Sequence, residues 1–209
     1  MSLSLPPYRP SADVAADKAE WRALVRAARR ELVSTWTDGR RDEVARSLGE
    51  GGLSHLRRYA AATGRAELAG ATVTAFEPMR TEPPVDGLTS VLRRAGVRVL
   101  VPLTLERPRL DWADLADPDR RPLGEQALAH VDLAFVPGLA VSRAGVRLGQ
   151  GGGYYDTVLP RLRELSGGAP VVIVLHDHEV VPDVPAAGHD AVVDGVLRPA
   201  SGVTPLPLP

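Results

Sequence analysis

The chain has 209 residues, which is enough for one well-packed domain and short for two. Its 25 basic and 26 acidic side chains nearly cancel, which argues against a general role on nucleic acids or membrane surfaces. The absence of cysteine excludes disulfides, thiolate metal sites and a cysteine nucleophile. No apolar run approaches the ~18 residues of a membrane-spanning helix, and the N-terminus lacks the layout of a secretory signal. We therefore expect a monomeric, cytoplasmic protein.

The N-terminal part predicts a tail followed by a helix. Residues 1–12 contain Pro6, Pro7 and Pro10 and indicate a flexible tail. Asp17 is the expected cap of the helix, with Glu20 three residues on as its reciprocal partner. Apolar residues then repeat at helical spacing on one face: Trp21, Leu24, Val25, Ala28 and Leu32. Basic residues lie mostly on the other face, where most arginines are expected to be solvated: Lys18, Arg22, Arg26, Arg29 and Arg30.

Helices and strands alternate through the rest of the chain. Residues 38–62 predict a second helical region, interrupted by a break at Gly49, Gly51 and Gly52. Strands are expected at 71–76, 97–103, 131–136, 169–175 and 195–197, a helix at 85–95, and an edge strand at 109–112, where Trp112 is either core or pocket wall. A helix should follow residue 153, with Pro160 kinking it or starting a new one.

This alternation predicts an α/β fold. We expect a single-domain three-layer sandwich at residues 13–199, Rossmann-like, with a mostly parallel sheet and helices on both faces. Residues 200–209 are expected to form a second flexible tail.

A glycine-rich block at residues 149–153 follows the strand at 131–136 and its Pro137-Gly138 turn. Strand, glycine loop and helix start together can cradle an anion, because the loop backbone can approach a phosphate and the free amides of the first helical turn point at it. The block fits neither the P-loop nor the dinucleotide motif. The alternative interpretation is a mobile surface loop.

Two charged residues flank this block. Arg147 precedes it and could pair with a phosphate in a bidentate way. Asp156 follows it and could hold Mg²⁺, which commonly binds through one or two carboxylates plus substrate phosphates.

The segments Pro137-Gly138-Leu139-Ala140, Gly145-Val146-Arg147-Leu148-Gly149 and Gly151-Gly152-Gly153-Tyr154-Tyr155-Asp156 together resemble the signature of the 5-formyltetrahydrofolate cyclo-ligase family. This resemblance implies ATP-dependent ring closure of 5-formyltetrahydrofolate to 5,10-methenyltetrahydrofolate, with small-molecule substrates and Mg²⁺. It also implies a fold similar to those of sugar-phosphate isomerases and CoA transferases.

The resemblance further implies roles for individual residues. The expected ATP-binding residues are Lys18, Arg22, Arg147, Gly149, Gly151, Gly152, Gly153, Tyr154 and Tyr155. Folate would contact Glu77, Glu82, Gln150 and Tyr154, and Mg²⁺ would contact Asp156 and Asp190. Catalytic roles are implied for Arg147 and Tyr154. For Glu82, the alternative reading is a carboxylate at the start of the helix at 85–95.

The sequence departs from the family pattern at two places. Gln150 stands where many members have an aromatic or basic residue. His176-Asp177-His178 would need a third ligand to hold zinc, and His189 is the one candidate nearby in sequence. Two other functions stay open at this stage: a phosphosugar enzyme, by analogy of fold alone, and a non-catalytic nucleotide- or folate-binding relative.

Overall fold

The computed structural model describes residues 4–188 and 190–208. Its main sheet has seven strands in the order β10-β9-β7-β4-β1-β2-β3. Their bounds are Gly202–Pro205, Gly195–Arg198, Val171–Val174, Leu133–Pro137, Thr72–Thr74, Arg98–Thr104 and Leu110–Asp114. The five inner strands run parallel, and β3 and β10 pair antiparallel at the two edges. The expected α/β class with a mostly parallel sheet is confirmed.

The strand order reverses direction between β1 and β4. From β1 the chain adds β2 and β3 on one side, and then β4, β7 and β9 on the other. Such a reversal leaves a crevice outside the carboxyl ends of the two strands, which is where open α/β sheets bind ligands.

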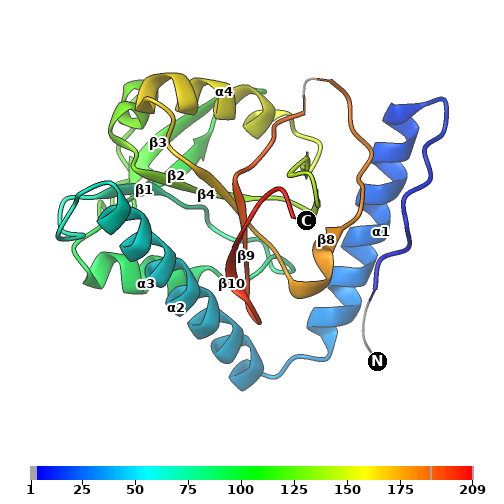
Figure 1. The fold of residues 1–209 in the computed structure, drawn as a ribbon, viewed down its shortest axis with the longest axis horizontal. Helices are drawn as coiled ribbons and strands as arrows, with labels where there is room; N and C mark the ends of the chain where they lie inside the picture. The colour runs from blue at the N-terminus through cyan, green and yellow to red at the C-terminus, as the bar shows by residue number, and fades with distance from the viewer. Residues whose placement is uncertain (1–3, 189, 209) are drawn as a thin grey trace.

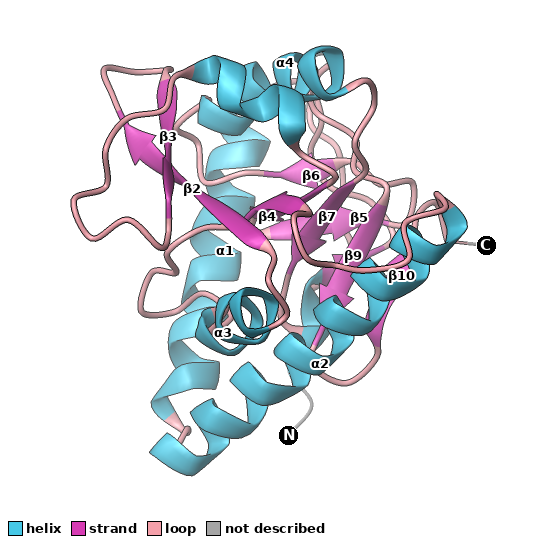
Figure 2. Cartoon of the chain, turned by 90° about the vertical axis from the view of Figure 1, so that its left-hand side faces the viewer, coloured by secondary structure: helices cyan, strands magenta, loops and turns pink. Residues whose placement is uncertain are grey.

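Helices cover both faces of the sheet. Helices α2, Asp38–Ala62, and α3, Asp86–Arg94, lie on one face, and α4, Tyr154–Ser166, with the 3₁₀ helix η1, Glu125–His130, lies on the other (Figures 1 and 2). Helix α1, Val14–Ser34, lies apart from these layers and packs on a small sheet. This sheet has the order β6-β5-β8, with the bounds Arg147–Leu148, Ala140–Ser142 and Val180–Val181.

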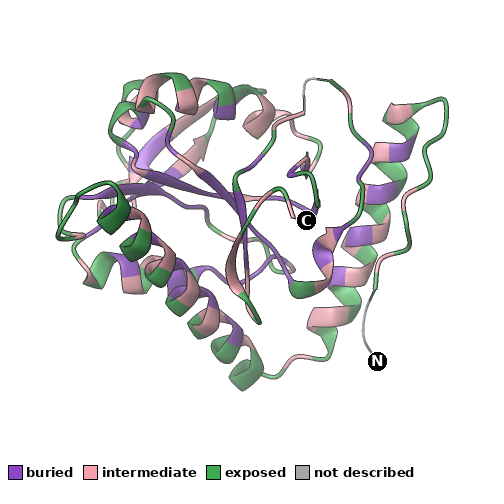
Figure 3. Cartoon of the chain, viewed as in Figure 1, coloured by how far each residue is buried: buried purple, intermediate pink, exposed green. Residues whose placement is uncertain are grey.

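The inner strands of the main sheet are buried (Figure 3). The core forms on both faces of the sheet because strand side chains alternate. Phe135 of β4 packs toward α2 and α3, whereas its neighbour Val136 packs toward α4. Trp112 belongs to the cluster under α4, so it is a core residue. Among the residues described, no helix combines the length and apolarity needed to cross a membrane.

Helix α2 is continuous over its 25 residues, so the expected break at its glycines is wrong. These glycines instead permit close packing. A Cβ at Gly49 would lie 2.9 Å from the carbonyl oxygen of Gly87 in α3, and one at Gly51 would lie 2.9 Å from the Cα of Gly202. Helix α2 therefore approaches α3 and β10 more closely than larger residues would allow.

The cap of α1 is Asp13, not Asp17. Asp13 accepts from the amides of Ala15 and Ala16 at 3.0 Å each. Asp17 accepts instead from the Tyr8 hydroxyl at 2.7 Å and from the amide and hydroxyl of Ser11. These bonds lower the pKa of Asp17, and the bond to Asp17 raises the pKa of Tyr8 to about 12. The part of the expected tail around Tyr8 and Ser11 is thus fastened to α1.

Two other segments differ in detail from the expectation. Residues 202–205, expected in the C-terminal tail, form β10, because the positive φ of Gly202, 63°, turns the chain back along β9. Helix α4 runs through Pro160 without a new start. Its proline lacks the amide that would have bonded to the carbonyl of Asp156.

The two histidines after β7 have structural contacts. His176 precedes the short 3₁₀ helix η2, Asp177–Glu179, and makes a capping box with Glu179. Its ring lies 3.1 Å from the Thr81 carbonyl oxygen and stacks on His178, with ring centroids 6.1 Å apart. His189, considered as a third zinc ligand, lies outside the described residues, and those described contain no cluster of metal-binding side chains.

We expect Gly87→Ala to destabilise the fold, because its Cβ would overlap the backbone carbonyl of Ala45 in α2. Overpacking of this kind costs about 1–3 kcal/mol. Gly39→Ala is the matched control, since Gly39 is the second residue of α2 as Gly87 is of α3, and its Cβ meets nothing closer than 4.0 Å. Urea unfolding of both variants measures the difference; equal stabilities would contradict the close-packing account.

Burial of His176 predicts acid sensitivity. Burial is the main cause that lowers its pKa below 6.5, so the unfolded chain binds this proton more tightly than the folded one. The stability from neutral His176 is therefore complete above about pH 6.5 and is lost as the pH falls below it. In urea unfolding at about pH 7.5 and about pH 5, His176→Gln should lose less stability on acidification than the parent. A His130→Asn control, at an exposed position, should not differ from the parent.

Candidate active site

A cavity of about 550 Å³ lies outside the carboxyl ends of β1, β2 and β4, at the reversal of strand order. Its walls come from the segment after β1, the ends of β2 and β4, helix α1 and the glycine loop. The lining residues are Arg26, Phe76, Glu77, Met79, Glu82, Pro102, Thr104, Leu110, Pro137, Arg147, Gly149, Gln150, Gly151, Gly152, Gly153, Tyr154, Tyr155 and Asp156. The cavity therefore gathers most of the residues that the sequence singled out.

The glycine loop connects β6 to α4. The helix begins after the loop as expected, but the strand directly before the loop is β6 and not the expected strand at 131–136, which is β4. Gly151 and Gly153 have φ of 94° and 76°, whereas Gly152 lies outside this left-handed region. Left-handed residues in a loop can turn backbone amides toward a bound anion when their neighbours are right-handed. The first amides of α4 can add to these donors, because they have no acceptor within the helix. The geometry thus fits an anion cradle better than a surface linker.

Only two of the three consecutive glycines adopt the left-handed conformation. Gly152 needs no left-handed conformation, and a Cβ there would lie 2.6 Å from the Tyr154 ring. A Cβ at Gly149 would lie 2.7 Å from the Arg147 guanidinium. Glycine is therefore needed at Gly151 and Gly153 for conformation, and at Gly149 and Gly152 for space.

Helix α1 brings cations to this loop, although the expected site residues Lys18, Arg22 and Asp190 are not among those that line the cavity. The Arg22 Nε donates to the Gly149 carbonyl at 3.0 Å, and Lys18 pairs with Asp190 at 2.6 Å. Burial and the neighbouring Arg26 lower the pKa of Arg22, while Asp156 and Asp190 act in the opposite direction. Arg22 therefore lies among the charges that were expected to serve phosphates and metal.

Arg147 and Asp156 face each other beneath the loop. Arg147, 4% exposed, donates to Asp156 at 2.6 Å and to the Pro137 carbonyl at 3.3 Å. Its guanidinium carbon lies 5.6 Å from the centre of the Tyr155 ring, within cation–π range. The Nε of Arg147 has no partner among the described residues.

Asp156 and Asp190 are the two acidic residues that were expected to hold a metal. Asp156 and Asp190 both act on Arg22, but the residues that the structure describes contain no group of three or more metal-binding side chains. Mg²⁺ suits such a pair, because it keeps waters and takes its other ligands from substrate phosphates.

Glu82 and Gln150 connect the cavity's two walls. Glu82, 4% exposed, accepts from the Gln150 side-chain amide at 2.8 Å and from the Met79 backbone amide at 2.9 Å. Helix α3 begins only at Asp86, so Glu82 is not the helix-start carboxylate of the alternative reading. It closes the loop after β1 and presents a buried carboxylate to the cavity.

The expectation of a solvated basic face on α1 is wrong for Arg26 and Arg29. Arg26 lines the cavity and donates to the backbone and side-chain oxygens of Gln150. Arg29 is fully buried and makes a two-pronged contact with Glu179 at 2.6 and 2.8 Å. Spacing at 22, 26 and 29 does put these side chains on one helix face, but the sequence does not show that a second wall covers it.

The other expected residues occupy the rim and floor. Glu77 lines the cavity but is largely exposed and pairs with Arg120 at 2.9 Å. Tyr154 lines the wall at the start of α4. Tyr155 packs against the core, and burial raises its pKa; its hydroxyl has no partner in the part of the chain that is described.

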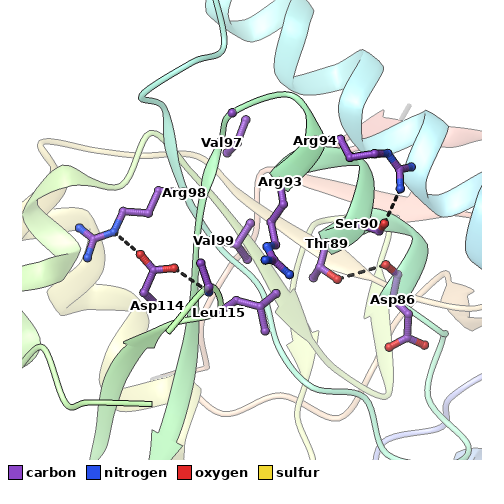
Figure 4. A pocket seen from close by; sticks show the side chains of 12 residues that line it. Asp86, Thr89, Ser90, Arg93, Arg94, Val97, Arg98, Val99, Asp114 and Leu115 are labelled. Atoms are coloured by element: carbon purple, nitrogen blue, oxygen red, sulfur yellow. Dashed lines mark hydrogen bonds and ion pairs between the residues drawn. The ribbon is translucent and has the colours of Figure 1, made fainter. Parts of the chain in front are cut away.

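A second hollow, of about 860 Å³, lies by the opposite end of the strands and is shallower (Figure 4). Its rim carries Arg93, Arg94 and Arg98 at exposed positions, with Arg98 paired to Asp114 at 2.8 Å. Arg93 and Arg94 end α3, where cations are favoured by the helix dipole. None of the residues expected at the active site lies here.

Comparison with known proteins agrees with this arrangement. The family model for the 5-formyltetrahydrofolate cyclo-ligase family matches residues 14–199. The 5-formyltetrahydrofolate cyclo-ligase of Mycolicibacterium smegmatis is 30% identical over 79% of this chain and 91% of its own.

Two solved structures share the fold. The 5,10-methenyltetrahydrofolate synthetase of Mycoplasma pneumoniae has a TM-score of 0.64 at 18% identity, over 86% of this chain and 97% of its own. That of Aquifex aeolicus has a TM-score of 0.62 at 22% identity, over 92% and 94%. A phosphosugar enzyme or a non-catalytic relative is not favoured. The chain belongs to the 5-formyltetrahydrofolate cyclo-ligase family.

Proposed function

We propose that this chain catalyses the ATP-dependent cyclisation of 5-formyltetrahydrofolate to 5,10-methenyltetrahydrofolate, releasing ADP and phosphate. The observation that carries this proposal is a single cavity with two chemically different sides. One side is a glycine loop surrounded by cations, and the other is a buried carboxylate beside apolar wall residues.

The loop side suits the triphosphate of ATP. Lys18, Arg22 and Arg147 supply positive charge, and the amides of residues 151–153 supply hydrogen-bond donors. Lys18 and Arg147 are paired with Asp190 and Asp156 in the structure. Binding of the nucleotide would let these cations exchange carboxylate partners for phosphate oxygens.

The carboxylate side suits the pterin ring of the folate. Its ring amide and amino groups are donors that match an acceptor such as Glu82, whereas a carboxylate would repel a triphosphate. Phe76, Met79 and Leu110 give this side an apolar wall. Tyr154, between the two sides, would pack against the bound ring.

The reaction requires the formyl oxygen to become a leaving group. The γ-phosphoryl group would pass from ATP to this oxygen, breaking its bond to the ADP oxygen. N10 of the folate then attacks the formyl carbon and gives up its proton, and the carbon–oxygen bond breaks to release phosphate. Such a sequence needs positioning and charge neutralisation more than a protein nucleophile. Arg147 is the residue best placed to neutralise the transferring group.

The carboxylates of Asp156 and Asp190 would hold Mg²⁺ together with the phosphates. The metal would supply further charge neutralisation at the phosphate oxygens. We also propose that the enzyme acts as a monomer in the cytoplasm.

The assay follows methenyltetrahydrofolate by its absorbance, together with ADP. 5-Formyltetrahydrofolate and ATP should give both products in equal amounts, with no product when either substrate is omitted. Product formation without ATP consumption would contradict the proposal.

Substitutions should separate the two substrates. Glu82→Gln should lower kcat/KM for folate by about ten- to a hundredfold, the loss expected for one charged hydrogen bond, with ATP binding nearly unchanged. Arg22→Ala should weaken ATP binding and leave folate binding nearly unchanged. Arg30→Ala, at an exposed position on the same helix, serves as the control. Calorimetric titration of each ligand into each variant measures the two affinities. If Glu82→Gln weakens ATP binding as much as folate binding, the assignment of Glu82 is wrong.

Asp156→Asn tests the metal role. Loss of this ligand should weaken binding of the magnesium–ATP complex but not of ATP alone, and should reduce turnover by roughly a hundredfold or more, as expected for lost metal charge stabilisation. Glu164→Gln, an exposed carboxylate on the same helix, is the matched control. An unchanged magnesium requirement would show that Asp156 serves Arg147 alone.

A further inference from the structure

The glycine loop is held from outside the family motif by Arg107. This residue lies in the hairpin between β2 and β3, which Figure 1 shows beside α4. Its Nη2 donates to the Gly151 carbonyl at 3.0 Å, and its Nε donates to the Gly152 carbonyl at 3.2 Å. The next residue, Pro108, is the nearest neighbour of a Cβ built at Gly153, at 3.9 Å. The hairpin therefore lies against the last three glycines of the loop.

Arg107 completes a row of restrained carbonyls. Arg22 donates to the carbonyl of Gly149 at 3.0 Å, and Arg26 to that of Gln150 at 2.7 Å. Together with the two bonds from Arg107, four consecutive carbonyls of the loop each accept from an arginine. Glycine loses more conformational freedom on ordering than any other residue, so an isolated loop of this composition would be mobile. The arginines fix it in one conformation.

The direction of the carbonyls decides the direction of the amides. In a planar trans peptide, the carbonyl of one residue and the amide hydrogen of the next point in opposite directions. Arg107 is exposed and does not line the cavity, whereas residues 151–153 do. With the carbonyls of Gly151 and Gly152 directed at Arg107, the amides of Gly152 and Gly153 are turned to the cavity side. Neither amide has an acceptor among the described residues.

We propose that Arg107 is a positioning residue that holds the Gly151 and Gly152 carbonyls outward, so that the following amides are oriented for the phosphates of the nucleotide. It acts through the loop and does not touch the substrate. The inference rests on the proposed function for the identity of the ligand, but the ordering of the empty loop can be measured by itself.

Arg107→Ala tests the proposal, with Arg109→Ala as the matched control. Arg109 is exposed in the same hairpin and carries the same charge, and removing its side chain leaves its backbone bonds to Leu105 and Glu106 intact. Without ligand, NMR order parameters of the residue 151–153 amides should fall in Arg107→Ala toward values of flexible backbone, below about 0.6. They should stay at parent values in Arg109→Ala.

The second measurement is nucleotide affinity by calorimetry. Arg107→Ala should weaken ATP by about tenfold, as expected when a preorganised site must be ordered on binding. It should raise KM for ATP but not for folate, and leave the thermal midpoint within a few degrees of the parent. Arg107→Lys keeps the charge but not the planar fork, so it should recover only part of the affinity.

Three outcomes would overturn the proposal. An equal loss of ATP affinity in Arg107→Ala and Arg109→Ala would mean a general charge effect. A loss of ATP affinity with unchanged order parameters of the ligand-free loop would mean that Arg107 contacts the ligand itself. Full recovery by Arg107→Lys would mean that charge alone matters. If the parent protein fails to bind ATP but its loop becomes more mobile in Arg107→Ala, the proposed function is refuted. The positioning role of Arg107 on the loop is then still supported.

Discussion

The site depends on the buried ion pair between Arg29 and Glu179, which fastens α1 across the carboxyl end of the sheet. Arg29 also donates to the Gly138 carbonyl at 2.6 Å, so one guanidinium ties the helix to the segments that follow β4 and β7. Removing one partner of such a pair costs about 3–5 kcal/mol, although the pair itself adds little over a well-packed apolar replacement. Its contribution is therefore orientation: it sets the rotation of α1 that brings Arg22 and Arg26 to the loop.

The cations at the site have partners within the protein itself. Lys18 and Arg147 each have a carboxylate partner, whereas Arg22 and Arg26 donate to loop oxygens. Uncompensated buried charges would destabilise the fold, and permanently neutralised ones would not attract a triphosphate. Exchangeable pairs between the same residues satisfy both requirements. In the proposed function, the phosphates would take these cations and leave the two carboxylates available to a metal.

The sequence predicted the helices and strands more accurately than it predicted the side-chain contacts. Apolar or β-branched runs and turn residues were sufficient for the five parallel strands of the main sheet, which are buried on both faces. The short strands of the small sheet, β5, β6 and β8, were not predicted. The break expected in α2 was wrong, since a glycine chosen for close helix packing cannot be told from a helix breaker in the sequence. Arg26 and Arg29 were misjudged for a similar reason: what covers a helix face is decided by segments more than a hundred residues away. Arg107 carries no local pattern at all, because its partners are backbone carbonyls of a distant loop.

Gln150 shows how the two sides of the cavity are joined. Its backbone belongs to the glycine loop, and its side-chain amide donates to Glu82 while its side-chain oxygen accepts from Arg26. A basic side chain could donate to Glu82 but would repel Arg26, and an aromatic ring would offer neither bond. A glutamine at position 150, where the resemblance leads us to expect an aromatic or basic residue, is therefore consistent with the presence of Arg26. A neutral amide can donate to an acid and accept from a base at once, so Gln150 connects the glycine loop with the carboxylate proposed to bind folate.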